Sequence, residues 1–512
     1  MDPTRKWTIG RSLVALIGAF VLAIVHQYLF YGNVPGVSYP LFMLLLYVYL
    51  FHDIRNRLME IHWFGWFLFT VVMLLSMTFV LYDNLVFYLL NMLVIPPLVF
   101  IHLAFVRGSK KFDWWDIRIV GSALNHLIPQ SLRHVPTVFR ILKVLTARRL
   151  GDRQKSIMSK VLIGLAIALP LLIIVVNLLA SADGLFNRFL AGLPEWWNDL
   201  SLGNSFARFI WIVIFGVLFF GYFWGFVKPK NSRPEVGIVG KAVQEDKGFK
   251  IDPIIMATLL ISVNVVYVLF VLVQFTYLFG AWDGALPDGK TYAEYARSGF
   301  LELVTVSMIN FAILMTTLVY GGGEDGLLRR MNAILLYILV GCSGVMLYSA
   351  YMRLILYEEV YGYTYIRFLV HAFMIYLAIL LIIAALRIRS IKIPLAQCYI
   401  VISLAAYVMV NYAGMDRIIA EKNIERYRDS GNIDAPYLST LSVDAFPLLV
   451  EFSKKEYPAM KPLLEKKRVS LSSEDRRWPS FNASRYRAEK QLSRLFGEAE
   501  RVSPRPTSSP FP

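Results

Sequence analysis

Long apolar runs separated by short polar segments make up most of the chain as far as residue 412. A membrane-spanning helix needs about 20 mostly apolar residues, because a hydrocarbon layer of about 30 Å is crossed at about 1.5 Å per residue. About eleven runs meet or approach this length. The predicted spans are residues 12–31, 36–51, 62–82, 84–106, 159–180, 206–227, 252–280, 298–320, 331–357, 366–386 and 395–412. The pattern therefore predicts an all-α fold, a polytopic transmembrane helical bundle.

Two of these runs have alternative interpretations. Residues 36–51 form the shortest run and carry Pro40 near its start, so a re-entrant or tilted segment competes with a complete crossing. The first run resembles the apolar region of a signal peptide. It is longer than such regions usually are, and no small-residue cleavage site follows it, so we interpret it as an uncleaved helix.

Composition supports the membrane interpretation. Apolar residues make up 57% of the chain and charged residues 17%, against about 45 to 50% and about 25% in globular proteins. This excludes a disordered or collagen-like chain, and the two cysteines, Cys342 and Cys398, exclude a disulfide scaffold. The net charge of +16 gains meaning only from the side of the membrane on which each basic residue lies.

Basic residues follow the alternation expected of an N-terminus in the cytoplasm. The segments then assigned to the inside hold most of the Lys and Arg residues that precede the tail. The outer connections and outer span ends hold Arg188, Arg208, Lys290, Arg297, Arg353 and Arg367. Under the positive-inside rule this predicts a cytoplasmic N-terminus, and an odd number of spans places the C-terminus outside the cytoplasm.

The polar segments divide the chain into five parts. The sequence predicts N-terminal spans in 1–106, a basic cytoplasmic loop in 107–158, further spans in 159–412, an extracytoplasmic helical tail in 413–500 and a disordered end in 501–512.

The basic cytoplasmic loop contains an amphipathic segment. Val138, Ile141, Leu142 and Leu145 recur at helical spacing, which favours a helix lying on anionic lipid headgroups. A protein partner docking at this loop or at the tail is the alternative. No nucleic-acid-binding motif accompanies the charge, so a nucleic-acid partner is not expected.

Charges inside apolar spans are costly and require an explanation. Glu302 and Arg353 lie near the outer ends of two consecutive spans, so a hairpin would bring them together as an ion pair. A purely structural pair is one interpretation. A gate or headgroup site is the other, because further polar residues are predicted at the same surface: Tyr292, Glu294, Tyr295 and Arg297.

Asn264, Tyr267 and Gln274 form a polar stripe along one predicted span. Such stripes usually join helices, and a lined pore is the alternative. His371 lies alone in its span and is interpreted as a core residue rather than a proton relay. The sequence contains no phosphate-binding loop and no zinc-protease or nucleophile-elbow motif. We therefore assign no catalytic residue, cofactor or metal ligand.

Several strings carry a resemblance to a known family. These are Asn177 to Asp183 (NLLASAD), Gln274 to Gly280 (QFTYLFG), Thr291 to Glu302 (TYAEYARSGFLE), Tyr361 to Arg367 (YGYTYIR), Asn423 to Tyr427 (NIERY), Asp434 to Leu438 (DAPYL), Leu441 to Pro447 (LSVDAFP) and Trp478 to Arg485 (WPSFNASR).

Together these strings resemble a bacterial family of multi-spanning membrane proteins catalogued only as a domain of unknown function. The resemblance covers roughly residues 160–490 and is weakest over the first four spans. It implies a location in the bacterial inner membrane and supplies no catalytic residue. Its family-like residues are Asn177, Asp183, Asn423, Arg426, Asp434, Tyr437 and Asp444.

Three function classes remain open. The leading hypothesis is a non-enzymatic sensor, scaffold or regulatory component of the cell envelope, because soluble segments are predicted on both faces and no catalytic motif is present. A transporter or channel for a small or lipidic solute is the alternative, since prolines interrupt the fourth and fifth spans. An enzyme acting on a lipid-linked substrate, with Glu294 or Glu302 as acid or base, is the third.

Overall fold

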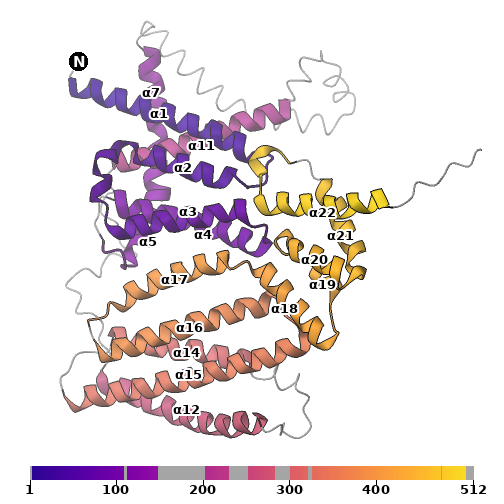
Figure 1. The fold of residues 1–512 in the computed structure, drawn as a ribbon. Helices are drawn as coiled ribbons and strands as arrows, with labels where there is room; N and C mark the ends of the chain where they lie inside the picture. Colours follow the sequence, from indigo (N-terminus) through magenta and orange to yellow (C-terminus); the bar gives the residue numbers. More distant parts are fainter. Residues whose placement is uncertain are drawn as a thin grey trace, which may run out of the picture. The chain divides into compact units, whose positions relative to one another are not determined.

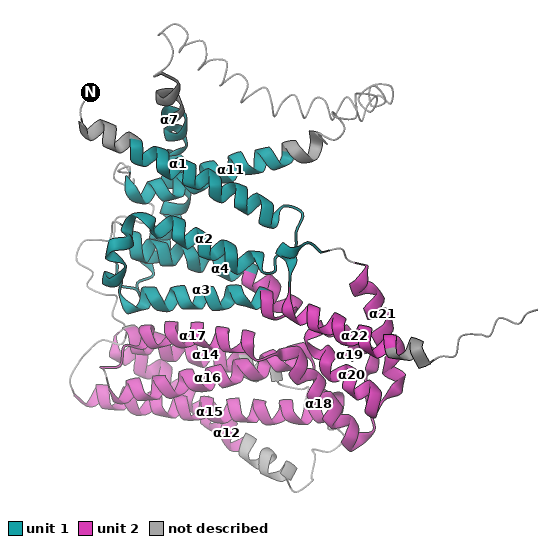
Figure 2. Ribbon diagram, turned by 45° about the horizontal axis from the view of Figure 1, so that its top comes forward, with its two compact units in different colours: residues 1–79, 92–232, 476–481 teal, residues 80–91, 233–475, 482–512 magenta. Residues whose placement is uncertain are grey.

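The computed structural model describes residues 3–108, 112–147, 202–229, 252–282, 300–320, 326–390, 392–473 and 476–502. Every regular element in these ranges is helical, and they contain no strand, which confirms the all-α prediction. The chain forms two compact units (Figure 2). Unit 1 comprises residues 1–79, 92–232 and 476–481, and unit 2 comprises residues 80–91, 233–475 and 482–512.

Eight helices in the described ranges are long and apolar enough to cross a membrane, which confirms the polytopic prediction. They are α1 (Pro3–Phe30), α3 (Trp63–Leu81), α4 (Leu85–Arg107), α11 (Leu202–Val227), α12 (Pro253–Trp282), α15 (Leu327–Tyr361), α16 (Tyr365–Arg389) and α17 (Leu395–Tyr412).

The other predicted spans differ in outcome. Residues 36–51 correspond to α2 (Ser38–Phe51), which has only 14 residues. The run at 298–320 corresponds to α14 (Phe300–Tyr320), whose apolar part Thr305–Val319 is shorter than the other spans. The run at 159–180 lies outside the described residues. The count of about eleven spans therefore stays a prediction.

Unit 1 contains α1, α2, most of α3 and α4, and α11, with shorter elements between them. These are η1 (His52–Glu60), α5 (Arg118–Asn125), η2 (His126–Gln130), α6 (Ser131–Arg133), α7 (Val135–Ala147) and η5 (Trp478–Ser480). Helices α1 and α11 pack along each other (Figure 1), where Ala19 and Ala23 are fully buried and the absence of a side chain at Gly216 leaves room for the Phe20 ring. Small residues allow helices in lipid to approach closely.

Helix α7 carries the amphipathic segment of the basic loop. Its apolar residues Val138 and Ile141 are buried within unit 1, where α7 contacts α1, α6 and α11. Arg140 is exposed. This part of the apolar face therefore packs against protein. The side chains of Leu142 and Leu145 lie outside the described residues, and lipid contact by this loop stays a prediction.

The apolar part of unit 2 is a group of adjacent helices. Figure 1 shows α12, α14, α15, α16 and α17 lying side by side. Their shared cores include Met346 and Leu354 of α15, Met374 of α16 and Leu260 of α12. A glycine in the left-handed region, Gly362 with φ +78°, ends α15 and permits the short turn into α16.

The tail forms the other part of unit 2. It comprises α18 (Met415–Ser430), α19 (Ala435–Thr440), η3 (Val443–Ala445), α20 (Phe446–Lys455), η4 (Pro458–Met460), α21 (Lys461–Ser472) and α22 (Ala483–Val502). Ile419, Leu438, Phe446 and Leu492 are fully buried in one apolar core that also contains Phe87 at the start of α4. The tail core therefore includes residues from the beginning of a membrane-spanning helix.

Candidate functional site

The centre of the site is a buried carboxylate, Asp416, in the first turn of α18. It is 1% exposed. Its oxygens accept hydrogen bonds from the Asn84 side-chain amide, from the Tyr365 hydroxyl and, at 2.9 Å, from the Ser442 backbone N–H. A buried charge is tolerated when donors surround it in this way. Asp416 therefore joins the α3–α4 connection, the start of α16 and the tail.

A second carboxylate, Asp444, lies beside the first. It accepts the Asp83 backbone N–H at 3.2 and 3.0 Å and the Ser442 hydroxyl at 3.0 Å. Ser442 thus binds both acids, through its backbone N–H to Asp416 and through its hydroxyl to Asp444. We call Asp83, Asn84, Tyr365, Asp416, Ser442 and Asp444 the tail-docking network.

The pKa of Asp444 reflects its buried surroundings. Burial raises the pKa of Asp444 from 3.8 to about 6, and the nearby Asp416 carboxylate raises it further, whereas hydrogen bonds from Ser484 and the Asp83 N–H oppose the rise. The oxygens of both acids already accept hydrogen bonds from protein donors. No cluster of three or more His, Cys, Asp or Glu suited to a metal ion occurs within the described ranges. The hydrogen bonds of the network connect the α3–α4 connection and the start of α16 to the tail.

A second set of contacts holds the turn between α15 and α16. The Asn423 side-chain amide donates to the Tyr363 carbonyl at 2.9 Å, and its oxygen accepts the Tyr363 N–H at 3.1 Å. Arg426 donates to the Val360 carbonyl at 3.0 Å. A Cβ atom at Gly362 would lie only 2.5 Å from the Asn423 Oδ1 atom. Side chains of α18 therefore hold this turn by hydrogen bonds to the backbone atoms of the turn.

Helix α19 adds one further contact to the same turn. The Tyr437 hydroxyl accepts the Tyr365 backbone N–H at 3.3 Å. Asp434 caps α19 by accepting the Tyr437 N–H at 2.9 Å, which satisfies an otherwise unpaired donor at the helix start. The cap therefore fixes the backbone of the residue whose hydroxyl holds the turn.

Elsewhere in unit 2, amide side chains join α4 to α17. Asn91 donates to the Asn411 side-chain oxygen at 2.7 Å and accepts from the Tyr407 hydroxyl at 2.7 Å. Asn411 in turn donates to the Tyr407 carbonyl at 2.8 Å. Bonds of this kind join helices in an apolar environment.

Five of the family-like residues predicted from the sequence meet here: Asn423, Arg426, Asp434, Tyr437 and Asp444. Sequence reasoning missed Asp83, Asn84, Tyr365, Asp416 and Ser442 as partners. The adjacent acid and amide between two apolar runs, Asp83 and Asn84, were the available signal. The other family-like residues, Asn177 and Asp183, lie outside the described residues.

The predicted polar cluster near Glu302 is only partly visible. Arg353 of α15 is buried, with 9% of the residue exposed. The Glu302 and Gln274 side chains lie outside the described set, and the same holds for Tyr292, Glu294, Tyr295 and Arg297. The ion pair between Glu302 and Arg353 therefore stays a prediction.

Two members of the predicted stripe on α12 are described. Asn264 is buried and donates to the Leu335 carbonyl of α15 at 2.8 Å. Tyr267 is partly buried against the apolar clusters that α12 shares with α15 and α16. Both residues thus contact neighbouring helices.

His371 has a titratable partner, which the sequence analysis did not anticipate. Its Nε2 atom lies 2.8 Å from the Glu358 Oε2 atom. His102 lies instead in unit 1 and contacts the Tyr47 hydroxyl at 2.9 Å.

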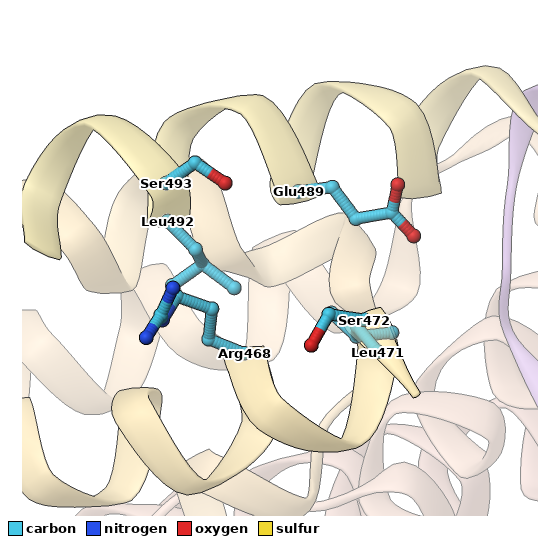
Figure 3. A pocket seen from close by; sticks show the side chains of 6 residues that line it. All are labelled: Arg468, Leu471, Ser472, Glu489, Leu492 and Ser493. Carbon is cyan, nitrogen blue, oxygen red and sulfur yellow. The ribbon is translucent and has the colours of Figure 1, made fainter. Parts of the chain in front are cut away.

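The tail also contains a small cavity of about 210 Å³ between α21 and α22 (Figure 3). Arg468 and Glu489 are the charged side chains that line it, with Leu471, Ser472, Leu492 and Ser493. Arg468 pairs with Glu465 at 2.6 Å, and Glu489 pairs with Arg485 at 3.1 Å. Since both charges already have partners within the tail, we assign no ligand to this cavity.

Comparison with known proteins gives one match. A family model described as a domain of unknown function (DUF4153) matches residues 69–452. The matched range begins earlier than the expected start near residue 160, within α3, and ends before the Trp478 string. It contains every residue of the tail-docking network. Neither the curated proteins nor the solved structures give a match.

Proposed function

The chain belongs to this family, which is described only as a domain of unknown function, and we propose that it is a non-enzymatic scaffold or regulatory component of the bacterial cell envelope. In this proposal the membrane helices anchor the helical tail, and the tail holds a protein partner. The observation that carries the proposal is the tail-docking network, in which Asp416 joins three separate elements.

The network supports a scaffold because it fixes the tail against helix ends. Hydrogen bonds to charged groups contribute about 1.5 to 3 kcal/mol each, and breaking one side of a buried set costs more because the partners are left unpaired. Such bonds reach the tail from the α3–α4 connection and from the start of α16. A tail held in this way presents its surface in one fixed orientation.

The bilayer that best suits this arrangement is the bacterial inner membrane, with the N-terminus in the cytoplasm and the tail outside it. The distribution of basic residues along the sequence supports this orientation. An alkaline phosphatase fused after Arg428 should be active. An inactive fusion, accompanied by an active cytoplasmic reporter at the same position, would place the tail inside.

Two surfaces are proposed for contacts outside the chain. The first is the tail, where Val469 on α21 and Tyr486 on α22 are about half exposed. The second is the basic loop, where Arg140 on α7 is exposed and suited to anionic headgroups. We favour the tail surface for a protein partner, because the tail-docking network fixes the orientation of the tail.

The contacts of Asn264 favour a scaffold over a lined pore. Its amide donates to the Leu335 carbonyl, so this polar group joins α12 to α15. If the protein is a transporter instead, vesicles containing it will show solute flux that Gln274→Leu or Glu302→Gln reduces.

Site-specific photo-cross-linking in cells tests the scaffold. A photoreactive amino acid at Val469, and separately at Tyr486, should give a discrete cross-linked product from the full-length protein. Asp416→Ala should abolish this product, because it releases the tail without changing α21 or α22. Asp429→Ala, an exposed change on the same helix α18, should preserve the product.

Two results would contradict the scaffold. The first is the absence of any product from either position. The second is a product that Asp416→Ala leaves unchanged, because the docking network would then have no part in holding the partner.

A further inference from the structure

Residues 118–140, in the basic loop, expose apolar side chains and bury polar ones. They comprise α5, η2, α6 and the first part of α7. The large apolar side chains on the outer side are 53 to 55% exposed: Leu124, Ile128, Leu132 and Phe139. The polar residues Gln130, Ser131 and His134 are buried. One side of this helical stretch is therefore apolar and open.

This distribution is the reverse of the one expected in water. A helical segment on a water-soluble surface exposes its polar side chains and buries its apolar ones. In lipid, polar side chains face neighbouring helices and apolar side chains face the acyl chains. The exposed side of residues 118–140 therefore suits hydrocarbon.

The buried side packs against α11 at two glycines that lie one turn apart. A Cβ atom at Gly225 would lie 3.1 Å from the His126 ring, and one at Gly221 would lie 2.6 Å from the Ser131 carbonyl oxygen. The His126 Nε2 atom lies 3.1 Å from the Tyr222 carbonyl oxygen. Small residues allow this close approach, as they do between helices in lipid.

The position of these glycines shows how far the segment reaches along α11. The apolar span Ala207–Val227 has 21 residues, and at about 1.5 Å per residue it matches a hydrocarbon layer of about 30 Å. Gly221 precedes Val227 by six residues, so Ser131 lies about 9 Å inside this end of the span. Helix α7 then crosses α1 and α11 (Figures 1 and 2). The segment therefore lies at the depth of the acyl chains.

The backbone of the segment suits this depth. Lipid supplies no hydrogen bonds, so backbone polar groups must find their partners within the protein. Pro129 has no N–H to donate, and the chain passes it in the π-helical turn His126–Gln130. The Ser131 backbone N–H and hydroxyl both donate to the His126 carbonyl, the hydroxyl at 3.0 Å. Serine side chains and π turns satisfy interrupted membrane helices in the same way.

Charge indicates which lipids the segment would contact. Residues 117–151 contain no Asp or Glu. Arg118 pairs with Asp116 just before the segment, whereas Arg133 and Arg140 are exposed on its outer side. A long arginine side chain extends from within the layer to the headgroups. This surface therefore complements anionic phospholipids.

We propose that residues 118–140 form a membrane-inserted element, whose apolar side lies among the acyl chains of one leaflet and whose arginines bind anionic headgroups. This inference deepens the proposed contact of the basic loop with lipid and rests on that part of the proposed function. A loop lying only on the membrane surface would not bring Ser131 to the level of Gly221. The tail takes no part in the insertion, so the cross-linking test of the tail is independent of it.

Spin-label accessibility in the full-length protein tests the insertion. The protein lacks its native cysteines and is placed in nanodiscs of phosphatidylethanolamine and phosphatidylglycerol, with a nitroxide attached at Ile128→Cys or Leu132→Cys. Oxygen, which concentrates in hydrocarbon, should relax both labels, and a water-soluble nickel chelate should not. Ile214→Cys on α11 is the exposed reference within a span, and Asn56→Cys in η1 is the exposed reference in a polar loop.

The ratio of oxygen to nickel accessibility decides between the possible surroundings. At both positions it should be close to the ratio at Ile214 and several-fold above the ratio at Asn56. A nickel accessibility equal to that at Asn56 would place the segment in water. Low accessibility to both reagents would show that protein covers it. Either of these two results would overturn the inference.

A second measurement tests the headgroup contact. Replacing phosphatidylcholine by phosphatidylglycerol in the nanodiscs should raise the thermal midpoint of the protein, and Arg133→Gln combined with Arg140→Gln should reduce this rise. Arg55→Gln combined with Arg57→Gln is the matched control, because both arginines are exposed in η1. This control should keep most of the rise. No rise in the parent, or equal losses from the two double changes, would contradict the binding of anionic headgroups by this element.

Discussion

Asn84 donates a hydrogen bond to the carboxylate of Asp416, although 332 positions separate the two residues in sequence. Asn84 lies between two apolar helices, and Asp416 begins the first helix of the tail. The Asn84 side chain also accepts the Phe87 N–H at 3.1 Å. One amide side chain therefore both caps the start of α4 and donates a hydrogen bond to the tail. The residue that precedes a membrane-spanning helix therefore also takes part in holding the tail.

Replacement of Asp416 should release the tail. Asp416→Ala leaves the buried Asn84 amide and the partly buried donors of Tyr365 and Ser442 without this acceptor, so the free energy of unfolding should fall by about 2 to 5 kcal/mol. Denaturant titration in detergent and limited proteolysis of the tail measure the effect. Asp429→Ala is the exposed control on α18 and should change stability by less than about 0.5 kcal/mol. Equal effects would show that the network does not hold the tail.

Asp444 should make the tail more stable in mild acid. Because its folded-state pKa is raised from 3.8 to about 6, the folded protein binds this proton more tightly than the unfolded chain does. The stabilisation is complete below about pH 4 and is lost as pH rises through about 6, with a total of at most about 3 kcal/mol. Unfolding free energies at pH 4.5 and 7.5 should differ in this sense, and Asp444→Asn should reduce the difference. A difference unchanged by this substitution would assign the effect elsewhere.

Gly362 should tolerate a side chain less well than Gly431 does. Both adopt positive φ values, +78° and +72°, so alanine costs about 1 kcal/mol of backbone strain at either position. At Gly362 the added Cβ would also meet Asn423, whereas nothing lies within 4 Å of a Cβ at Gly431. Gly362→Ala should therefore lower the thermal midpoint clearly more than Gly431→Ala. Similar midpoints would indicate that the Asn423 side chain can move aside to make room for the added Cβ atom.

Asn264 should contribute modestly to helix association. Asn264→Leu removes the bond to the Leu335 carbonyl and should cost about 0.6 to 2 kcal/mol. Ser262→Ala is the control on the same helix, since the exposed Ser262 hydroxyl donates to the Thr258 carbonyl in the preceding turn of α12. Thermal unfolding in detergent compares the two. If Asn264→Leu is the less harmful change, the bond between α12 and α15 contributes no stability.

Glu302 and Arg353 allow a test of the predicted hairpin pair. Arg353 is buried, and a lone buried charge costs more than none. Glu302→Ala alone should therefore reduce folded yield more than Glu302→Ala combined with Arg353→Met. Size-exclusion profiles and unfolding midpoints provide the comparison. Equal losses from the single and double changes would show that the two side chains do not meet.

Much of the fold was predictable because the determining signal is local. Apolar runs long enough to cross lipid predicted α15, α16 and α17, and the run in Met415–Ser430 is polar enough to leave the membrane. The predicted run at 36–51 agrees with α2 to within two residues, although its 14 residues are few for a complete crossing. The largest difference in a boundary is at α1, which begins at Pro3 rather than near residue 12. The family strings pointed to Asn423, Tyr437 and Asp444 without indicating what these residues bind.

Sequence by itself determined that lipid surrounds most of this chain, because hydropathy and length are properties of consecutive residues. Only the tertiary structure decided that Asp416 meets Asn84 and Tyr365, and that Glu358 meets His371. Such pairs join helices that are remote in sequence or separated by a turn, and their distances depend on how those helices pack. A buried carboxylate acquires its partners from that packing, and hydropathy patterns carry no information about which donors will lie beside it.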